Sequence, residues 1–253
     1  MTTELRIIGA SCAVPNPGAA TSGYLVTASQ GTTVLLECGH GAVGALRRYI
    51  DPAVLSAVVV SHMHPDHFFD LVALRNYFYT RGLPPVDLHL PSNGPEILLG
   101  ISQAMGLPDS YFPRAFRILP HQAGTSFRVG SLRMETMAAR HSIEAHVMKV
   151  VDENDRSIVF SGDTAVMPEL SDFAEGCDLL LVEVTDKDAK QQEPRYHMGP
   201  AEVAGVVQRS RPGLVVLTHY DAAHGDEILA RVRQEATQAD VLLATEGEVH
   251  GIG

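Results

Sequence analysis

Residues 61–67 read Ser-His-Met-His-Pro-Asp-His. They continue from Val54–Ser61, which we predict to be a strand. The unbroken apolar run Ala57–Val60 indicates that both faces of this strand are covered. Polar residues at the end of a buried strand are where binding and catalytic sites are commonly built on a sheet. The stretch therefore predicts a metal site, in preference to a solvated loop that happens to contain histidines.

The spacing within this stretch suits two metal ions. Side chains two positions apart on an extended segment point the same way, so His62 and His64 can share one ion. Once the chain turns into a helix, Asp66 and His67 can face a second ion beside the first. Two ions held by nitrogen and oxygen a few ångströms apart can hold a bridging hydroxide. Four ligands from one loop cannot complete two sites, so further ligands must come from elsewhere.

Three polar residues stand at the ends of other predicted strands. His141, Asp163 and His219 each follow an apolar or β-branched run. Taken singly, a polar residue at a strand end is more often structural or solvated than a ligand. Taken together with residues 61–67, the three are the expected remaining ligands.

The composition is that of an ordinary globular chain. The sequence has 253 residues, with no linker, repeat or low-complexity tract, so we expect a single domain over residues 1–253. Its 45% hydrophobic and 19% charged residues exclude disorder, collagen and a disulfide scaffold. A formal net charge of −11 gives no general attraction to nucleic acid or to an anionic membrane.

Cysteine usage and the N-terminus bear on localisation. Cys12, Cys38 and Cys177 are far apart and odd in number, which favours a reduced, cytoplasmic protein. The first residues lack a basic start followed by an apolar segment, so we predict no signal peptide. The apolar runs are also shorter than a membrane span, and no membrane association is expected.

The order of the predicted elements favours sheets covered by helices, because a run of strands is followed by strand–helix alternation. We expect strands at residues 5–8, 23–28, 32–37, 54–61, 86–90, 126–139, 145–151, 158–160, 179–184, 214–217 and 241–244. We expect helices at residues 42–50, 66–80, 94–105, 200–209 and 226–237.

The order of these candidate ligands resembles that of the metallo-β-lactamase fold and, within it, the ribonuclease Z-like branch. Three early motifs also resemble that branch: Gly9–Pro15, Thr21–Leu25 and Glu37–Gly41. The similarity runs from about residue 5 to about residue 250. It implies an α/β (α+β) fold, a four-layer αββα sandwich with its site at one edge of the paired sheets, and a metal-dependent hydrolase.

The resemblance assigns seven ligands to two divalent ions. The ligands of the first ion are His62, His64 and His141, and those of the second are Asp66, His67 and His219. Asp163 is the bridge between the two ions. The family implies zinc, and mixed imidazole and carboxylate ligation also suits manganese or iron. A bridging carboxylate in place of cysteine speaks against a true β-lactamase.

The resemblance also implies three catalytic residues. Glu183 and His197 match a pair that in this family helps proton transfer to the leaving group. A carboxylate raises the pKa of an adjacent imidazole, which can then act as a general acid. The alternative is that Glu183 pairs at the surface and His197 is a loop residue. Asp66 matches a residue that is both a ligand and a proton acceptor from the attacking water.

The chain departs from the tRNA-processing members in one segment. Those members carry a long tRNA-gripping arm between the counterparts of His141 and Asp163. Here the interval is 163 − 141 = 22 residues, and strand–turn–strand patterns fill it. A Pro-x-Lys-x-Gly-x-Pro segment is absent as well, and the net charge is −11. We therefore do not expect structured tRNA as the substrate.

The leading hypothesis is a dinuclear zinc phosphodiesterase that acts on small or cyclic phosphodiesters. The alternative is a carboxylic ester, lactone, thioester or aryl sulfate hydrolase, and a tRNA 3′-processing endoribonuclease ranks below both. Cationic side chains in the pocket would favour phosphate, and Arg140 and Lys187 are the nearby candidates. A non-catalytic scaffold would have lost one or more ligands, whereas all seven are present. Related proteins are often dimers, so a homodimer is a further expectation.

Overall fold

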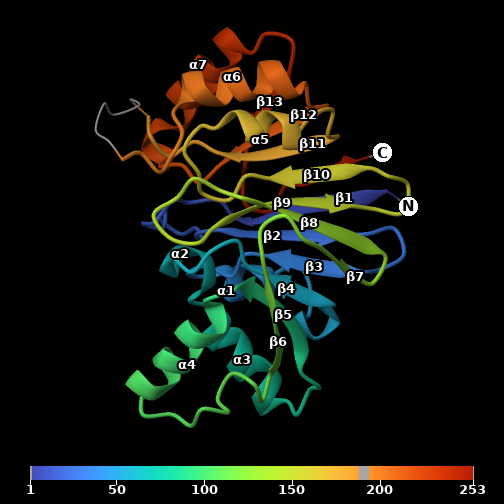
Figure 1. Cartoon of the computed structure of the whole chain (residues 1–253), viewed down its shortest axis with the longest axis vertical. Helices are drawn as coiled ribbons and strands as arrows, with labels where there is room; N and C mark the ends of the chain where they lie inside the picture. The colour runs from blue at the N-terminus through green and yellow to red at the C-terminus, as the bar shows by residue number, and fades with distance from the viewer. Residues whose placement is uncertain (1, 188–193, 253) are drawn as a thin grey trace.

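The protein is built from two seven-stranded sheets that pack face to face, with helices on both outer sides (Figure 1). The structure is a computed structural model, and it describes residues 2–187 and 194–252. The four layers form the αββα sandwich that the sequence predicted.

The first sheet has the strand order β14-β1-β2-β3-β4-β5-β6. Its strands are β1 (Thr3–Gly9), β2 (Gly23–Thr27), β3 (Thr33–Leu36), β4 (Ala57–Val59), β5 (Val86–Pro91), β6 (Phe116–His121) and β14 (Val249–Ile252). Pairing is antiparallel from β14 to β3 and parallel from β3 to β6.

The second sheet has the order β13-β12-β11-β10-β9-β8-β7. Its strands are β7 (Ser126–Val129), β8 (Leu132–Ala138), β9 (His146–Val151), β10 (Ser157–Phe160), β11 (Leu179–Glu183), β12 (Leu214–Thr218) and β13 (Asp240–Leu243). Pairing is antiparallel from β7 to β10 and parallel from β10 to β13, so each sheet joins an antiparallel half to a parallel half.

Helices cover the outer face of each sheet. Those beside the first sheet are α1 (Ala42–Leu46), α2 (Pro65–Phe68), α3 (Leu71–Thr80) and α4 (Gly94–Ala104), with a 3₁₀ turn at Pro52–Val54. Those beside the second are α5 (Pro168–Phe173), α6 (Pro200–Ser210) and α7 (Gly225–Glu235), with a 3₁₀ turn at Ala222–His224. In Figure 1 the first group lies in the lower half and the second group at the top.

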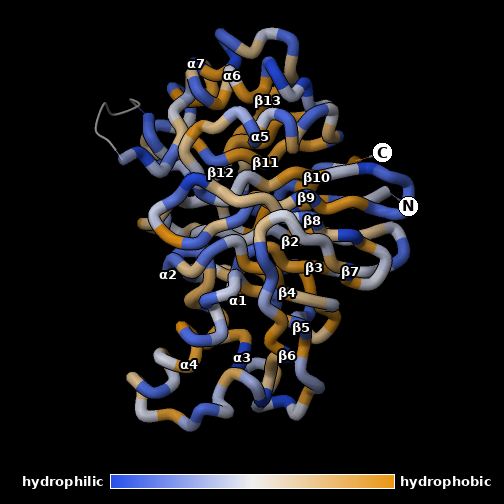
Figure 2. The backbone as a smooth tube through the Cα atoms, in the orientation of Figure 1, coloured by the Kyte–Doolittle hydropathy of each residue, from blue (hydrophilic) through white to orange (hydrophobic). Residues whose placement is uncertain are grey.

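Side chains that alternate along the strands fill three apolar cores. In β4, Val58 packs toward the helices while Val59 packs into the space between the sheets. In β11, Leu180 packs against the second helical layer and Leu181 packs between the sheets. A strand covered on both faces must be apolar at every position, which explains the unbroken runs that marked these strands in the sequence. Figure 2 shows the hydrophobic residues concentrated in the sheets.

Four expected elements differ in extent. The strand predicted over 54–61 is shorter: Val54 belongs to a 3₁₀ turn, and β4 spans Ala57–Val59. The helix predicted over 66–80 is two helices, because Asp70 is used in tertiary contacts: its amide donates to the Cys38 carbonyl and its carboxylate accepts from the Val43 amide at 2.9 Å. The strand predicted over 126–139 is the hairpin β7–β8, whose turn places Gly130 at a φ of +53°. Helix α1 ends at Leu46, four residues before the predicted end at Ile50.

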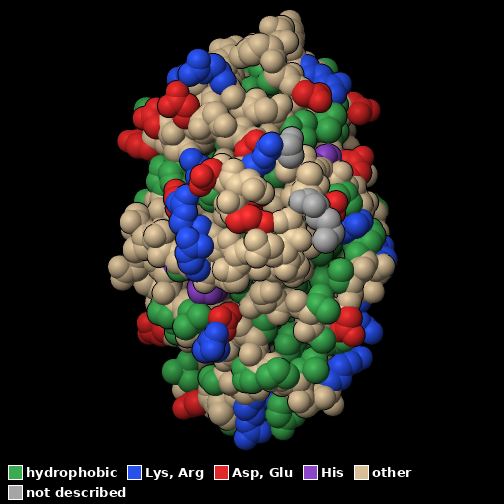
Figure 3. Space-filling model, turned by 90° about the vertical axis from the view of Figure 1, so that its right-hand side faces the viewer, with side chains coloured by type: hydrophobic (Ala, Val, Ile, Leu, Met, Phe, Trp, Pro, Cys, Tyr) green, Lys and Arg blue, Asp and Glu red, His purple; other side chains and the backbone are tan. Residues whose placement is uncertain are grey.

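The molecular surface is mixed in charge. On the face drawn in Figure 3, basic side chains lie in small groups among acidic and uncharged ones. No helix within residues 2–187 and 194–252 is both long and apolar enough to cross a membrane.

Candidate metal centre

The seven residues proposed from the sequence lie together at one edge of the sandwich. They come from the loop after β4, from α2, and from the loops after β8, β10 and β12. The C-terminal ends of parallel strands meet at the same edge of a sheet, so polar residues that follow β4, β10 and β12 converge there. A backbone bridge between His62 and Ala145 joins the two sheets at this edge.

The first group of donor atoms comes from three histidines. The Nε2 atom of His62 lies 3.2 Å from Nδ1 of His64, which lies 3.0 Å from Nε2 of His141. Three imidazole nitrogens this close can point at one ion. His62 is fully buried and the other two are partly exposed, so one side of this group faces outward.

The second group combines carboxylates and imidazoles, and all its members are buried. The Oδ2 atom of Asp66 lies 3.1 Å from Nε2 of His219 and 3.4 Å from Nε2 of His67. Burial raises the pKa of Asp66, but the adjacent His219 and His67 outweigh burial and hold that pKa well below its usual range. The carboxylate is therefore ionised and available to a cation.

Asp163 lies between the two groups. Its Oδ2 atom is 3.8 Å from Nε2 of His62 in the first group, and 3.4 Å and 3.5 Å from the Nε2 atoms of His67 and His219 in the second. This carboxylate is within reach of both sets, which is the position that a bridging ligand needs.

The donor set fits divalent cations. The Nε2 atom of His67 is buried and has no hydrogen-bond partner among the described residues, so its lone pair has no other use. Burial, together with the neighbouring His67, lowers the pKa of His62 well below its usual value, which keeps that imidazole neutral. Neutral imidazoles and ionised carboxylates are the forms in which these side chains bind metals.

Two imidazoles of the first group are each oriented by a second contact. The Nδ1 atom of His62 lies 2.9 Å from Oγ of Ser61, and Nδ1 of His141 lies 3.2 Å from the Tyr196 carbonyl. When Nδ1 carries the proton for such a contact, Nε2 keeps its lone pair for the ion.

Glu37 orients His67, and the sequence reasoning did not assign it this role. Its Oε2 atom lies 3.3 Å from Nδ1 of His67, while Oε1 accepts from the Ser61 amide at 2.7 Å. Glu37 is fully buried with a positive φ of 62°. In the sequence, Glu37–Gly41 could be noted only as a motif that resembles the family. The partner of Glu37 could not be predicted, because it is set by the pairing of β3 with β4.

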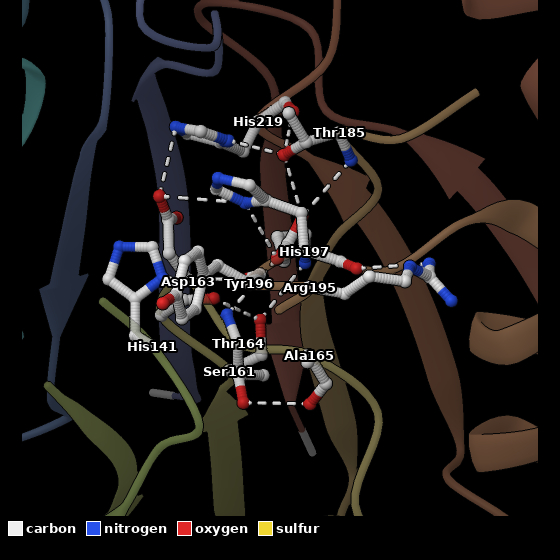
Figure 4. Close-up of polar contacts among 12 residues, drawn as sticks. His141, Ser161, Asp163, Thr164, Ala165, Thr185, Arg195, Tyr196, His197 and His219 are labelled. Atoms are coloured by element: carbon white, nitrogen blue, oxygen red, sulfur yellow. Dashed lines mark hydrogen bonds and ion pairs between the residues drawn. The ribbon is translucent and has the colours of Figure 1, made fainter. Parts of the chain in front are cut away.

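Thr185 was also missed, and it links a candidate ligand to Glu183. Its hydroxyl donates to Oε2 of Glu183 at 2.6 Å and lies 2.7 Å from Nδ1 of His219 (Figure 4). A hydroxyl has one proton, so a Thr185 that donates to Glu183 accepts from His219. The arrangement leaves Nε2 of His219 unprotonated and facing Asp66 and Asp163. Thr185 stands two positions after Glu183, and no motif in the sequence marks it as a functional residue.

Glu183 and His197 form a pair beside Asp163. The Nδ1 atom of His197 lies 3.1 Å from Oε1 of Glu183 and 3.9 Å from Oδ2 of Asp163 (Figure 4). Glu183 is fully buried, and the Thr164 amide donates to it at 3.0 Å. Burial works against the imidazolium, but the Glu183 hydrogen bond and charge prevail and raise the pKa of His197 to about 9.

Of the two cations expected beside the centre, Arg140 and Lys187, the structure shows Lys187 paired with a carboxylate. Lys187 forms an ion pair with Glu227 at 3.2 Å. Arg195 donates to Glu202 at 2.6 and 2.7 Å. Arg140 gives its backbone amide to the Thr164 hydroxyl at 3.0 Å. His40, in the loop before α1, contacts the ring of Phe69 edge to face, with 5.4 Å between ring centroids.

Comparison with known sequences gives one family and a set of distant relatives. The family described as "Beta-lactamase superfamily domain" matches residues 32–220. An uncharacterized protein of Mycobacterium leprae is 28% identical over 222 residues, which cover 87% of this chain and 78% of that protein. A ribonuclease Z of Mycobacterium bovis is 25% identical over 245 residues, which cover 88% of this chain and 87% of that enzyme.

Solved structures share the fold over nearly the whole chain. The metallo-β-lactamase fold protein YhfI of Bacillus subtilis superposes with a TM-score of 0.86 at 21% identity, covering 99% of both chains. A structure described as a new diphosphatase from the PhnP family has a TM-score of 0.78 at 14% identity, covering 99% of this chain and 98% of that one.

Proposed function

This chain belongs to the β-lactamase superfamily and is a metal-dependent hydrolase, and we propose that within this superfamily it is a dinuclear zinc phosphodiesterase acting on small or cyclic phosphodiesters. The proposal rests on one observation above all: the Asp163 carboxylate belongs to one group of donor atoms, lies 3.8 Å from His62 of the other group, and has the Glu183–His197 pair beside it. Such a site has a place for a nucleophile and a proton donor for the leaving group.

The proposed ligands divide between two ions. His62, His64 and His141 would hold the first, Asp66, His67 and His219 would hold the second, and Asp163 would serve both. When bound, two divalent cations lower the pKa of an intervening water and polarise the phosphate, and manganese or iron would supply the same chemistry as zinc.

Asp66 is suited to guide the attacking water. One of its oxygens faces His67 and His219. The depressed pKa of Asp66 keeps the second oxygen ionised, so that it can accept a hydrogen bond from a water held in the centre.

His197 is suited to protonate the leaving group. Its Nδ1 atom is engaged with Glu183, and its side chain is partly exposed at the centre. Because its pKa is raised to about 9, the imidazole is protonated at neutral pH. A protonated imidazole beside the site of cleavage can give its proton to a departing alkoxide.

The surroundings of the centre favour a small substrate. The interval of 22 residues from His141 to Asp163 holds β9, β10 and their connecting turn, all of which belong to the second sheet. A net charge of −11 also opposes binding of a large polyanion such as tRNA. The related ribonuclease Z and diphosphatase carry names that denote cleavage at phosphorus, which supports the reaction type.

One observation favours the alternative, hydrolysis of a carboxylic ester, lactone, thioester or aryl sulfate. Lys187 and Arg195, two cations that precede His197 in the sequence, are held by Glu227 and Glu202. A phosphate would then depend on the metal ions for most of its charge neutralisation. An acyl or aryl substrate has less need of these side chains.

The test is a comparison of three p-nitrophenyl substrates on the zinc-loaded protein: bis(p-nitrophenyl) phosphate, p-nitrophenyl acetate and p-nitrophenyl sulfate. We expect diester cleavage that is lost in Asp66→Ala and retained in Asp172→Ala, an exposed aspartate on α5 that serves as a matched control. Turnover of the acetate or sulfate alone would instead establish the alternative. Activity that survives in Asp66→Ala would refute the assigned centre.

A further inference from the structure

A group of arginines lies at the ends of α1 and α3 that point away from the metal centre. Arg47 and Arg48 follow α1, and Arg81 follows α3. Together with Tyr49 and Tyr77 they line a cavity of about 410 Å³. Of the three arginines, only Arg47 and Arg48 are adjacent in the sequence. Arg81 joins them because the two helices pack side by side.

Two of these arginines have no acidic partner. Among the described residues, neither Arg47 nor Arg81 has a carboxylate within ion-pair distance, whereas Arg48 pairs with Glu246. The guanidinium carbon of Arg81 lies 3.8 Å from the centroid of the Tyr77 ring, and that of Arg47 lies 5.5 Å from it. Stacking on a ring fixes a guanidinium while leaving its N–H edge free to donate.

Asp51 lines the same cavity but is used to hold Tyr77. It accepts a hydrogen bond from the Tyr77 hydroxyl and another from the Ala53 amide at 2.9 Å. These hydrogen bonds, with smaller contributions from Arg81 and Arg47, hold its pKa below the usual value. The Asp51–Tyr77 contact therefore fixes the ring on which the two arginines lie.

A second cavity shares this wall. It measures about 390 Å³, is lined by Arg47, Tyr77 and Arg81 on one side, and extends between α1 and α3 to Asp70. Neither cavity is lined by a proposed metal ligand, and Tyr77 lies roughly 9 Å along α3 from its first residue, Leu71. A ligand of a few ångströms bound at the arginines would not contact the metal ligands.

We propose that this arginine pocket, defined by Arg47, Arg48, Arg81 and Tyr77, is a binding site for a small anion that carries one or more phosphate groups, separate from the metal centre. Planar guanidinium groups match the oxygen geometry of phosphate through paired N–H donors. In a chain of net charge −11, the lining of this cavity carries Arg47, Arg48 and Arg81 against the single carboxylate of Asp51, which is a local exception to the prevailing charge. The cavity is large enough for a diphosphate group with part of its organic substituent.

The experiment uses inorganic pyrophosphate as the probe in calorimetric titrations of the zinc-loaded protein. The double variant Arg47→Gln/Arg81→Gln removes the charges while keeping long side chains. Arg117→Gln is the control, because Arg117 is an exposed arginine paired with Asp87. The metal centre can also bind pyrophosphate, and Asp163→Asn serves to separate that contribution.

We expect the double variant to bind pyrophosphate about 10- to 100-fold more weakly at one site, as for loss of charge-assisted hydrogen bonds. That site persists in Asp163→Asn and in Arg117→Gln, and thermal unfolding shows that the double variant is folded. Diester hydrolysis is unchanged in the double variant, which distinguishes this site from the metal centre.

Two results would overturn the proposal. One is equal pyrophosphate affinity in the double variant and the wild type. The other is equal weakening of pyrophosphate binding by sodium chloride and by sodium sulfate at matched ionic strength, which would indicate general ion screening. If the metal centre were misassigned, Asp163→Asn would leave pyrophosphate binding and hydrolysis intact, but the effect of the arginine variants would remain.

Discussion

At the scale of single residues, the centre depends on how its imidazoles are turned. A histidine ligand must present a lone pair, and a contact to its other nitrogen decides which nitrogen is free. Four candidate ligands have such a contact in the described structure. The contacts join Ser61 to His62, Glu37 to His67, Tyr196 to His141, and Thr185 to His219.

Thr185 offers the clearest test of this orientation. Thr185→Val removes the acceptor for Nδ1 of His219 while keeping the size of the side chain, so we expect zinc affinity to fall by about 10- to 100-fold. Competition with a chromophoric chelator measures this affinity directly. Thr185→Ser restores the hydroxyl and should restore affinity. Equal affinity in the valine variant would show that the Thr185 contact does not orient His219.

His197 gives a prediction on pH. The protonated form is the proton donor, so cleavage of a diester with an alkoxide leaving group falls as pH rises through the pKa of His197. That pKa is raised to about 9 in the protein alone, and bound cations shift it lower. A p-nitrophenolate leaving group needs no proton, so its rate shows no such fall.

The His197→Ala variant separates the two substrates further. We expect its kcat on the alkyl diester to fall by about 10²- to 10⁴-fold, with little change for the p-nitrophenyl diester. Stopped-time assays over pH 6 to pH 10 measure both profiles. A parallel loss on both substrates would assign His197 to a structural role.

The sequence indicates the candidate ligands better than it indicates the residues that contact them. His62, His64 and Asp66 stand in one short stretch, so their spacing alone brings them together. Glu37 contacts Ser61, which lies 24 positions away, and Thr185 contacts His219, which lies 34 positions away. No local sequence pattern encodes those contacts. Such residues become visible only when strand pairing is known.

At the scale of elements, the centre depends on close packing between the loop after β3 and helix α2. A Cβ atom added at Gly39 would lie 1.8 Å from the Asp66 carbonyl oxygen and 2.2 Å from the Thr21 hydroxyl. The same carbonyl accepts a hydrogen bond from Thr21 at 2.7 Å. Position 39 therefore requires a glycine, because the Asp66 backbone approaches it so closely.

This contact predicts that Gly39→Ala displaces Asp66. We expect a loss of about 1–3 kcal/mol in the free energy of unfolding, together with weaker metal binding. Gly44→Ala is the matched control, because Gly44 lies within α1 with open space around it. That change should raise the free energy of unfolding by about 0.5–1 kcal/mol. Chemical denaturation measures both. A Gly39→Ala protein with wild-type stability and metal content would contradict the packing argument.

Element boundaries show what sequence patterns miss. The buried strands β4, β11 and β12 were predicted from unbroken apolar runs, and they were found. Strands β6 and β14 and helix α5 were not predicted. β6 has partly exposed residues at its centre, and β14 is four residues long and contains Gly251, so neither produces a clear apolar or alternating pattern. Their strand state is set by pairing with β5 and β1.

At the scale of the whole molecule, the centre gathers negative charge in the interior. Glu37, Asp66, Asp163 and Glu183 are all buried at this edge. Buried carboxylates are costly unless they are paired, and cations held by the donor groups would pair them. Metal binding should therefore stabilise the fold as well as supply the chemistry.

Removal of metal by a chelator tests this link. Ligand at a thousand times its dissociation constant stabilises a protein by about 4 kcal/mol, which for a chain of this size corresponds to a rise in Tm of roughly 10 °C. We expect chelated protein to unfold at least that much lower in a calorimetric scan, with recovery on adding zinc. An unchanged Tm would mean that the buried carboxylates are balanced by the protein alone.

Other whole-chain expectations stay predictions: a single domain over residues 1–253, a homodimer and a cytoplasmic location. The overall architecture was predictable because an ordered set of ligands, read with the strand pattern, resembles one family. Substrate preference was not predictable, because it depends on whether side chains such as Lys187 are free to bind a substrate. The ion pair of Lys187 with Glu227 forms only in the folded chain.

The most direct test of the central claim is the metal content of the chain after loading with zinc and removal of unbound ions. Elemental analysis should give about two zinc ions per chain, and fewer in Asp163→Asn, which loses the group shared by both sets of donors. A wild-type chain that retains no zinc, or an Asp163→Asn chain that retains as much as the wild type, would contradict the assignment of a dinuclear centre.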